Sequence, residues 1–404
     1  MAGPLVGIRV LDLSRILAGP WASQMLADLG AEVVKIERPG SGDDTRAWGP
    51  PYMPDEMGEA TSESAYFHGA NRGKQSVCID MSQPQGQTLI QDLVRQCDVL
   101  IENFKVGGLK KYGLDFASLQ AINPRLVYCS ITGFGQTGPY AERAGYDFMI
   151  QAMGGMMSIT GEADGLPMKT GVAIADILTG LYAANAIQAA LIHQQKTGAG
   201  QHIDMALLDV QVATLASQAM NYLATGTSPA RLGNAHPNIV PYQAFETSDS
   251  YIILAVGNDS QFLRFCELAG KPEIAADERF QQNSKRVRNR DALVLQVQEI
   301  MLQKSSAAWL EALNARGIPC GPINNIEQVF ADPQVQHRGM QLELDHPASG
   351  KVAGVASPIR LSRTPIEYEQ APPLLGQHTD DVLSRLLALD ATEIARLHND
   401  GIVV

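Results

Sequence analysis

The chain has 404 residues, of which 45% are hydrophobic and 18% are charged. These proportions are typical of a globular protein with a substantial core, and the length allows two domains or one large domain with a smaller insertion. The net charge of −12 argues against a nucleic-acid partner, because neutralising phosphates requires clustered Lys and Arg.

The N-terminal residues enter a strand pattern almost at once, without the features of a leader peptide. No apolar run of the sequence approaches the length of a membrane span. We therefore expect a cytoplasmic protein with no membrane partner. The eight histidines form no pair at helical spacing, so we expect no metal site. The five cysteines are scattered without CxxC spacing, which predicts free thiols in a reducing compartment: Cys78, Cys97, Cys129, Cys266 and Cys320.

Strand and helix patterns alternate through the first half of the chain. We predict strands at residues 7–12, 31–37, 76–80, 98–102, 126–131 and 202–206, and helices at 19–30, 84–96 and 178–195. This alternation is typical of an α/β fold with a parallel sheet covered on both faces.

The regular alternation of strands and helices ends after a further predicted helix at residues 209–223. Strands are predicted at 243–247 and 251–256, and helices at 260–269, 290–301 and 306–315. We interpret residues 226–330 as a smaller α/β domain. The tail, with a predicted helix at 379–387, returns to the large domain, which then comprises residues 1–225 and 331–404.

A small apolar run at residues 171–175 brings Asp176 to the start of the long helical pattern. The positive end of the helix dipole and its unpaired N–H groups are expected to keep this carboxylate ionised. An ionised carboxylate among small neighbours has what a covalent nucleophile requires. The alternative is an ordinary helix N-cap.

Residues 133–138 fit the GxGxxG pattern of dinucleotide-binding loops. That pattern requires a helix that opens within the glycines, whereas here Pro139 follows the last glycine and a loop continues. We therefore do not expect a nicotinamide or flavin site.

Basic residues follow the ends of predicted strands or lie in the loops beyond them, namely Arg38, Arg46, Arg72 and Lys74. The carboxyl ends of parallel strands form the ligand crevice of an open α/β sheet, so this group favours a phosphorylated ligand over solvated surface charge. Tyr146 could donate a hydrogen bond to a developing oxyanion or could belong to the core. The loop at 233–238 is either a mobile segment or a simple connector.

Taken together, the chain resembles the class III CoA-transferases over essentially its whole length. The matching segments are GIRVLDLS (7–14), AGP (18–20), LGAEVVKIERPG (29–40), ENF (102–104), SITGFGQTGP (130–139), the Asp176 segment, GIPCGP (317–322) and LLGQHT (374–379). Further segments resemble the succinyl-CoA:glutarate branch of that family: GSGDDTRAWGPP (40–51), RAGYD (143–147), IVPYQAF (239–245) and GPINN (321–325).

The resemblance implies a large Rossmann-like domain with a small middle domain, and two subunits threaded through each other as an interlocked homodimer. It implies that Asp176 is the nucleophile. Tyr146 and the backbone amides near Gly233 are our own candidates for supporting an oxyanion. Positions matching the family's CoA contacts are Ile16, Leu17, Ala18, Arg38, Asn103, Phe104 and Lys111, and we add Arg72 and Lys74 on their placement after strands. CoA and acyl-CoA would be substrates, with no tightly bound cofactor.

Two departures from relatives narrow the expected activity. Related α-methylacyl-CoA racemases carry a His where this chain has Tyr146, and without that base two-base proton exchange loses one partner. The oxalate enzymes carry a glycine run where this chain has residues 236–238, which favours a longer dicarboxylate. Arg46 and His236 could bind its remote carboxylate.

We therefore expect CoA transfer from succinyl-CoA or a similar donor to a small dicarboxylate such as glutarate. The alternatives are a racemase of the α-methylacyl-CoA type and a non-catalytic acyl-CoA-binding protein.

Overall fold

The computed structural model describes residues 3–404, which divide into two compact units. Among these residues, unit 1 comprises 3–156, Thr170–Met220 and Gln336–Val404, and unit 2 comprises Met157–Lys169 and Asn221–Val335. The division differs from the expected one mainly at residues 157–169, which join the smaller unit. This short segment pairs with the loop around Gly233, whose N–H donates to the Gly161 carbonyl at 3.0 Å.

Unit 1 is built on a six-stranded sheet in which every strand pairs in parallel, as predicted. The strand order is β5-β2-β1-β6-β7-β8. The order reverses direction between β1 and β6, which makes the sheet doubly wound and places a crevice at their carboxyl ends. The strands are β1 (Arg9–Asp12), β2 (Glu32–Glu37), β5 (Lys74–Cys78), β6 (Val99–Glu102), β7 (Val127–Thr132) and β8 (His202–Ala206).

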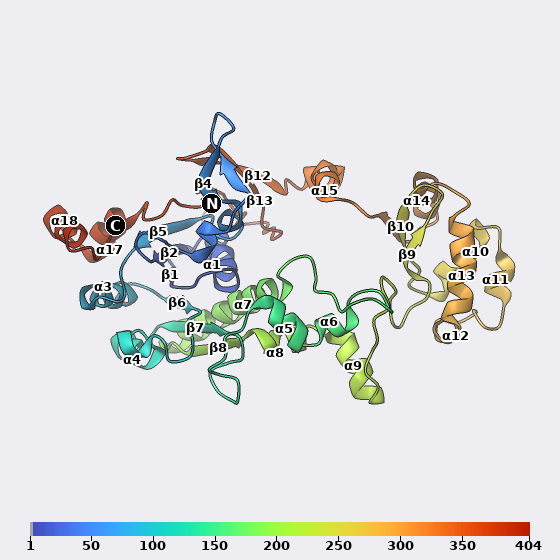
Figure 1. The fold of residues 1–404 in the computed structure, drawn as a ribbon, viewed down its shortest axis with the longest axis horizontal. Coiled ribbons are helices and arrows are strands. Elements are labelled where there is room, and N and C mark those ends of the chain that lie inside the picture. The colour runs from blue at the N-terminus through green and yellow to red at the C-terminus, as the bar shows by residue number, and fades with distance from the viewer. Residues whose placement is uncertain (1–2) are drawn as a thin grey trace. The chain divides into compact units, whose positions relative to one another are not determined.

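Helices cover both faces of this sheet (Figure 1). One layer contains α1 (Ala18–Asp28), α5 (Asp147–Met153), α7 (Ile174–Thr197) and α8 (Leu207–Ala213). The other contains α3 (Pro84–Arg95), α4 (Phe116–Ile122), α17 (Thr379–Leu387) and α18 (Ala391–Asn399). The last two come from the C-terminal tail, which thus packs in the same unit as the N-terminal strands.

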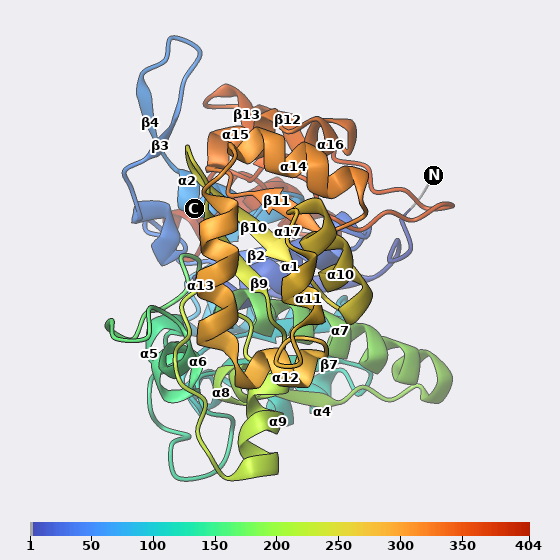
Figure 2. The same ribbon diagram turned by 90° about the vertical axis from the view of Figure 1, so that its right-hand side faces the viewer.

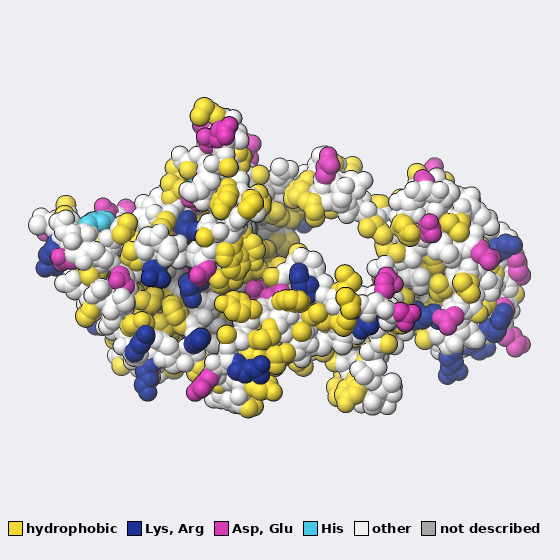
Figure 3. All heavy atoms as spheres, viewed as in Figure 1, with side chains coloured by type: hydrophobic (Ala, Val, Ile, Leu, Met, Phe, Trp, Pro, Cys, Tyr) yellow, Lys and Arg dark blue, Asp and Glu magenta, His cyan; other side chains and the backbone are white. Residues whose placement is uncertain are grey.

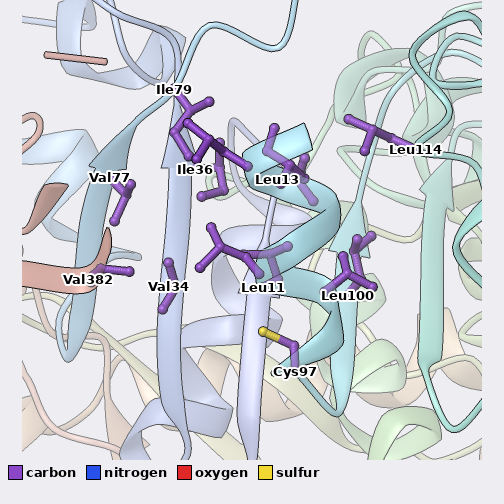
Figure 4. Packing of buried hydrophobic residues seen from close by; sticks show 14 of the residues in the cluster. Leu11, Leu13, Val34, Ile36, Val77, Ile79, Cys97, Leu100, Leu114 and Val382 are labelled. Atoms are coloured by element: carbon purple, nitrogen blue, oxygen red, sulfur yellow. The ribbon is translucent and has the colours of Figure 1, made fainter. Parts of the chain in front are cut away.

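Strand alternation divides the core between the two layers. On β1, Val10 packs toward α1 and α7, whereas Leu11 packs toward α3 and α17. Figure 4 shows the second of these clusters, in which Val34, Leu11 and Leu100 from three adjacent strands lie in a row that starts next to Val382 of α17. All four side chains are fully buried. The sheet is therefore buried on both faces, which explains its nearly continuous apolar strands.

Several short elements of unit 1 were not predicted. A hairpin of β3 (Tyr52–Pro54) and β4 (Ala60–Ser64) leads into α2 (Ala65–His68), and β12 (Gln341–His346) pairs with β13 (Gly350–Val355). The predicted helix at 209–223 is two helices, α8 and α9 (Ala216–Thr225), because the chain breaks where Ala216 adopts a φ of 47°.

Unit 2 contains an antiparallel sheet of β9 (Tyr242–Glu246), β10 (Tyr251–Ala255) and β11 (Cys320–Pro322), in the order β11-β10-β9. Its core joins apolar residues of the sheet to those of the surrounding helices, with Phe245 and Trp309 fully buried. Figure 2 shows these helices in front of the strands. They are α10 (Asp259–Leu268), α11 (Pro272–Ala276), α12 (Asn283–Arg288), α13 (Arg290–Met301) and α14 (Ser306–Ala315), followed by α15 (Ile326–Ala331).

Helix α7, with 24 residues, is the one described helix whose length and apolar composition would allow it to cross a membrane. A core helix passes the same test. This helix packs against α1, β7 and β8, and Ala183, Ile187 and Leu191 on that side are buried. We therefore interpret it as the central helix of unit 1.

Candidate active site

A cavity of about 1120 Å³ lies at the carboxyl ends of the parallel strands of unit 1. Its walls are formed by the segments that directly follow β1, β2, β5, β6 and β7, together with Asp176 of α7. This is where ligands bind in doubly wound sheets. The cavity is at the upper end of the size range of small-molecule sites, so it has room for a large, nucleotide-like molecule.

The cavity brings together most of the site residues named from the sequence. Those that line it are Ile16, Leu17, Ala18, Arg38, Asn103, Phe104, Lys111, Tyr146 and Asp176. Arg46, Arg72 and Lys74 are not among its lining residues. His236 belongs to unit 2, where its ring lies 5.2 Å from that of Tyr242.

Arg72 and Lys74 are held by partners inside the protein. The Arg72 guanidinium binds both carboxylate oxygens of Asp28, at 2.8 and 2.6 Å. Lys74 is fully buried, and its Nζ lies 3.3 Å from Asp12 and donates to the Pro20 carbonyl at 2.9 Å. Both side chains therefore stabilise the fold beneath the site, and neither is free to bind a phosphate.

Arg46 is similarly engaged. Its guanidinium donates to the two oxygens of Glu37 at 2.8 and 2.7 Å and stacks over the ring of Phe67 at 3.7 Å. A paired arginine of this kind anchors the loop after β2 and does not offer its charge to a substrate carboxylate.

The turn between β1 and α1 is held in an unusual conformation. Ile16 has a φ of 73°, which is rare for a β-branched residue and marks a position that the surrounding structure imposes. The Asp43 carboxylate accepts the Ile16 N–H at 3.1 Å, and Lys35 bridges Asp43 to the Ser14 carbonyl at 2.9 and 2.7 Å. Burial opposes ionisation of Asp43, but the ammonium of Lys35 prevails and lowers the pKa of Asp43 to about 2. A permanent ion pair thus fixes the backbone of this wall.

The loops after β1 and β6 are hydrogen-bonded to each other at the point where the strand order of the sheet reverses. Asn103 donates to the Arg15 carbonyl at 2.6 Å and accepts the Arg15 N–H at 2.9 Å. The Arg15 guanidinium lies 5.6 Å from the Phe104 ring centroid. This arrangement places a cation and an aromatic face side by side on the wall, which suits a phosphorylated aromatic ligand. In the space-filling view, Lys and Arg side chains stand out around α3, α4 and β6 (Figure 3).

Asp176 is the third residue of α7, in its first turn, and lines the cavity. The start of α7 lacks a cap from its own N-cap residue, Ala173. Instead Asp147, the first residue of α5, accepts the Ala175 N–H at 2.8 Å. Gln151 holds the other oxygen of Asp147 at 2.8 Å and accepts the Thr170 N–H at 3.0 Å. A network from α5 therefore fixes the backbone on which Asp176 is carried.

The ionisation of Asp176 differs from what its helix position suggests. Burial, followed by the charge of Asp147, raises the pKa of Asp176 to about 7. Its carboxylate accepts no hydrogen bond from any residue in the range 3–404. Burial and the charge of Asp147 therefore oppose the ionisation that the start of the helix was expected to favour. A poorly hydrated carboxylate with a pKa near neutrality is a better nucleophile when ionised than a solvated one.

Tyr146 is the N-cap residue of α5 and is 64% exposed, so it is a surface residue at the cavity and not part of the core. Its position depends on two glycines. A Cβ on Gly145 would lie 2.4 Å from the Gly133 Cα, and one on Gly133 would lie 2.5 Å from the Gly145 Cα. Gly133, the first glycine of the GxGxxG pattern, therefore allows its backbone to contact that of Gly145 beside the site. The other two glycines of the pattern, Gly135 and Gly138, form turns with φ of 86° and 93°.

Three neighbours of the site were not named from the sequence. Arg15 and Trp48 line the cavity, and the ring of Trp48 packs edge-on against Tyr66 at 5.0 Å. Burial raises the pKa of Tyr66, and the charges of Asp176 and Asp147 add to this effect. Arg15 follows β1 and could have been found by the rule used for Arg38. Trp48 and Tyr66 belong to loops and short elements without a periodic signal.

Comparison with known proteins identifies the family. The sequence model of CoA-transferase family III matches residues 5–379. The chain belongs to CoA-transferase family III. The CoA-transferase activity inferred from the motifs is thereby confirmed at the level of the family, as is the α/β fold.

Named relatives are similar over nearly the whole chain. It is 55% identical to a succinate–glutarate CoA-transferase of Agrobacterium fabrum, over 96% of this chain and 97% of the relative. It is 44% identical to the human succinyl-CoA:glutarate CoA-transferase, over 99% and 90% respectively. The crystal structure of a CAIB/BAIF family protein from Brucella suis superposes with a TM-score of 0.84 at 54% identity, covering 96% of this chain and all of that one.

Proposed function

We propose that the protein transfers CoA from succinyl-CoA to glutarate or a closely similar dicarboxylate, reversibly, with Asp176 as the covalent nucleophile. The observation that carries the proposal is the placement of a half-buried carboxylate without hydrogen-bond partners among the described residues, on a helix start, in the wall of a cavity large enough for CoA. The two named relatives with the highest identities above support the choice of donor and acceptor.

CoA would lie along the carboxyl ends of the strands. Arg38 and Lys111 are exposed cations on the cavity wall, and they would bind the phosphates. Arg15 and Phe104 would contact the adenine, and the backbone of Ile16, Leu17 and Ala18 would line its path. The thioester end would then reach Asp176.

The proposed reaction proceeds through four acyl transfers. Asp176 attacks the succinyl-CoA carbonyl, which gives a succinyl–aspartyl anhydride and releases the CoA thiolate. The thiolate attacks the Asp176 carbonyl, which forms an aspartyl-CoA thioester and releases succinate. Glutarate attacks that thioester, which forms a glutaryl–aspartyl anhydride and releases the CoA thiolate. The thiolate then attacks the glutaryl carbonyl, which gives glutaryl-CoA and frees the Asp176 carboxylate. Thioester-level energy is retained at every step.

Oxyanions that develop during these steps need hydrogen-bond donors. Tyr146 at the edge of the cavity would be one such donor. The Gly233 N–H donates to the Gly161 carbonyl within unit 2, so we do not assign it this role. The binding of the remote carboxylate of the acceptor by His236 stays a prediction. Because Arg46 is bound by Glu37, we no longer assign it that role.

We also propose that the working protein is a homodimer in the cytoplasm. Large apolar side chains remain exposed on the central helix of unit 1, at Leu181, Tyr182 and Ile192. Such exposure is uncommon on a core helix and is removed when a second subunit packs there.

The experiment mixes the purified protein with succinyl-CoA and a panel of dicarboxylates and identifies new acyl-CoA species by mass spectrometry. Glutaryl-CoA should form fastest, and Asp176→Ala should abolish its formation while CoA binding is retained. The absence of any new thioester would contradict the proposal and support a binding protein. Exchange of the α-proton of a 2-methylacyl-CoA in deuterated water would instead support the racemase alternative.

A further inference from the structure

Three potential metal ligands meet in unit 1 away from the residues that line the cavity. Glu63 lies on β4, His68 is the last residue of α2, and His346 is the last residue of β12. One donor atom of each lies within 4.8 Å of the other two. The Glu63 Oε2 is 3.6 Å from the His68 Nε2, and the two imidazole rings are 5.0 Å apart between centroids, tilted by 58°.

Both imidazoles are buried, and three of their four ring nitrogens lack a hydrogen-bond partner. The His68 side chain is 5% exposed and His346 is 3% exposed. Among the described residues, no polar atom forms a hydrogen bond with either ring nitrogen of His68 or with Nε2 of His346. The Nδ1 of His346 accepts the Ala348 N–H at 3.3 Å. Binding of a metal ion at Nε2 would place the ring proton on Nδ1 and replace this contact. Burying such groups unpaired is costly, and a ligand that binds them removes the cost.

The neighbouring charges allow a cation at this point. Arg46 Nη1 lies 3.6 Å from Glu63 Oε2, which at first sight disfavours a metal ion. However, the same guanidinium is already bound through its other nitrogens to both oxygens of Glu37. The charge of Arg46 is therefore offset by Glu37, and Glu63 remains available to a second cation.

We propose that Glu63, His68 and His346 bind one divalent transition-metal ion, with Zn²⁺ as the ion that fits best. Two imidazoles and one carboxylate form a common zinc ligand set, which leaves a fourth position for water. Imidazole ligands disfavour Mg²⁺ and Ca²⁺, which prefer oxygen. Sequence spacing gives no sign of this site, because its ligands are separated by 5 and 278 positions and lie on three different elements.

The ion would bring together three elements of unit 1. It would connect the β3–β4 hairpin and α2 to the β12–β13 hairpin. Helix α2 also carries Tyr66, whose ring packs at 5.0 Å against that of Trp48, a residue of the cavity wall. Metal binding would thus fix the helix that supports Trp48.

The test uses the full-length protein after removal of metals by a chelator. Calorimetric titration with ZnCl₂ should show saturable binding of one ion per chain, and Zn²⁺ should raise the melting temperature. His346→Gln should weaken binding on the order of a hundredfold, whereas His193→Gln, which removes an exposed histidine of α7, should leave it unchanged. Absence of saturable binding, or equal affinity in wild type and His346→Gln, would overturn the proposal.

A second variant keeps the proposal testable if His346→Gln fails to fold. His346→Cys retains a zinc ligand and should add a thiolate-to-metal charge-transfer band when Co²⁺ is bound, a band that wild type lacks. If Co²⁺ binds to His346→Cys without this band, residue 346 is not a ligand and the site is not the one proposed. Both readouts are independent of enzymatic activity.

Discussion

The Asp147 carboxylate accepts the backbone N–H of Ala175 at 2.8 Å, immediately before Asp176 in the chain. Asp147 thereby acts on Asp176 in two ways. It holds the first turn of α7 in place, and its negative charge adds to burial in raising the pKa of Asp176 to about 7. One side chain therefore contributes both to the position of the nucleophile and to the pH at which it is ionised.

Replacing Asp147 by Asn should separate these two effects. The Asn Oδ1 can still accept the Ala175 N–H, but the negative charge near Asp176 is gone, so the pKa of Asp176 should fall. Because the nucleophile must be ionised, the acid side of the profile of kcat against pH should move to lower pH. The amide nitrogen of the new Asn side chain cannot accept the hydrogen bond that Gln151 donates to Asp147. The start of α7 is then held less firmly, so kcat at its optimum should drop about tenfold. Asp291→Asn, an exposed first-turn acid of α13, serves as the control; an unmoved acid limb in Asp147→Asn would refute this coupling.

The raised pKa of Asp176 also predicts a cost in stability. Because the pKa in the folded state, about 7, exceeds the ordinary aspartate value of 3.8, the folded state binds the proton more tightly. Stability from this group is therefore present at low pH and is lost as the pH rises between these two values. Asp176→Asn should raise the free energy of unfolding by up to about 4 kcal/mol at pH 8 and by much less near pH 4, as measured by urea denaturation. A variant that is less stable than wild type at pH 8 would show that Asp176 is not strained by burial.

Arg38 and Arg72, both expected from the sequence to contact CoA, should behave differently when mutated. Arg38 is exposed on the cavity wall, so Arg38→Ala should raise the KM for succinyl-CoA about tenfold with little change in melting temperature. Arg72 is buried and paired with Asp28, so Arg72→Ala should destabilise the protein by about 3 kcal/mol, because it leaves an unpaired buried carboxylate. Steady-state kinetics and thermal unfolding of the two variants distinguish a role in CoA binding from a role in stability. If Arg72→Ala raises KM without loss of stability, its assignment to the fold is wrong.

The contact between Gly133 and Gly145 predicts a sensitive position outside the nucleophile. In Gly145→Ala the new methyl group would lie 2.4 Å from the Gly133 Cα, so the backbone must move and carry Tyr146 and Asp147 with it. We expect kcat to fall at least a hundredfold while CoA binding, measured by calorimetry, changes little. Gly321→Ala in β11 is the matched control, because no atom lies within 4 Å of its added Cβ. Full activity of Gly145→Ala would show that this close approach is not required.

The sequence predicted the elements that have a clear apolar periodicity. Strands such as β8 and helices such as α13 were predicted at their observed bounds, because each has its own apolar periodicity. It did not predict the β3–β4 and β12–β13 hairpins, whose short strands are only partly buried. In β12, Leu342 and Leu344 alternate with polar residues, so this strand did carry a signal. For the site, the rule that ligands bind beyond the strand ends located Arg38 on the cavity wall, and the family resemblance located Asn103 there.

The same rule failed to distinguish an exposed cation from a buried one. Lys74 lies on β5 and Arg72 lies just before it, and their partners Asp12 and Asp28 are 62 and 44 positions away. Such pairing depends on how strands are ordered in the sheet, which local sequence patterns do not reveal. The pKa of Asp176 was misjudged for a similar reason, because Asp147 approaches it from a separate helix 29 positions earlier.

The account rests on the acylation of Asp176 during turnover, and this can be observed directly. The protein is incubated with succinyl-CoA alone, treated with hydroxylamine, digested and mapped by mass spectrometry, with Asp176→Ala and Asp147→Asn treated in parallel. We predict an aspartyl hydroxamate at residue 176 in wild type and in Asp147→Asn, formed only when succinyl-CoA is present. An unmodified residue 176 in protein that continues to form glutaryl-CoA would contradict the account.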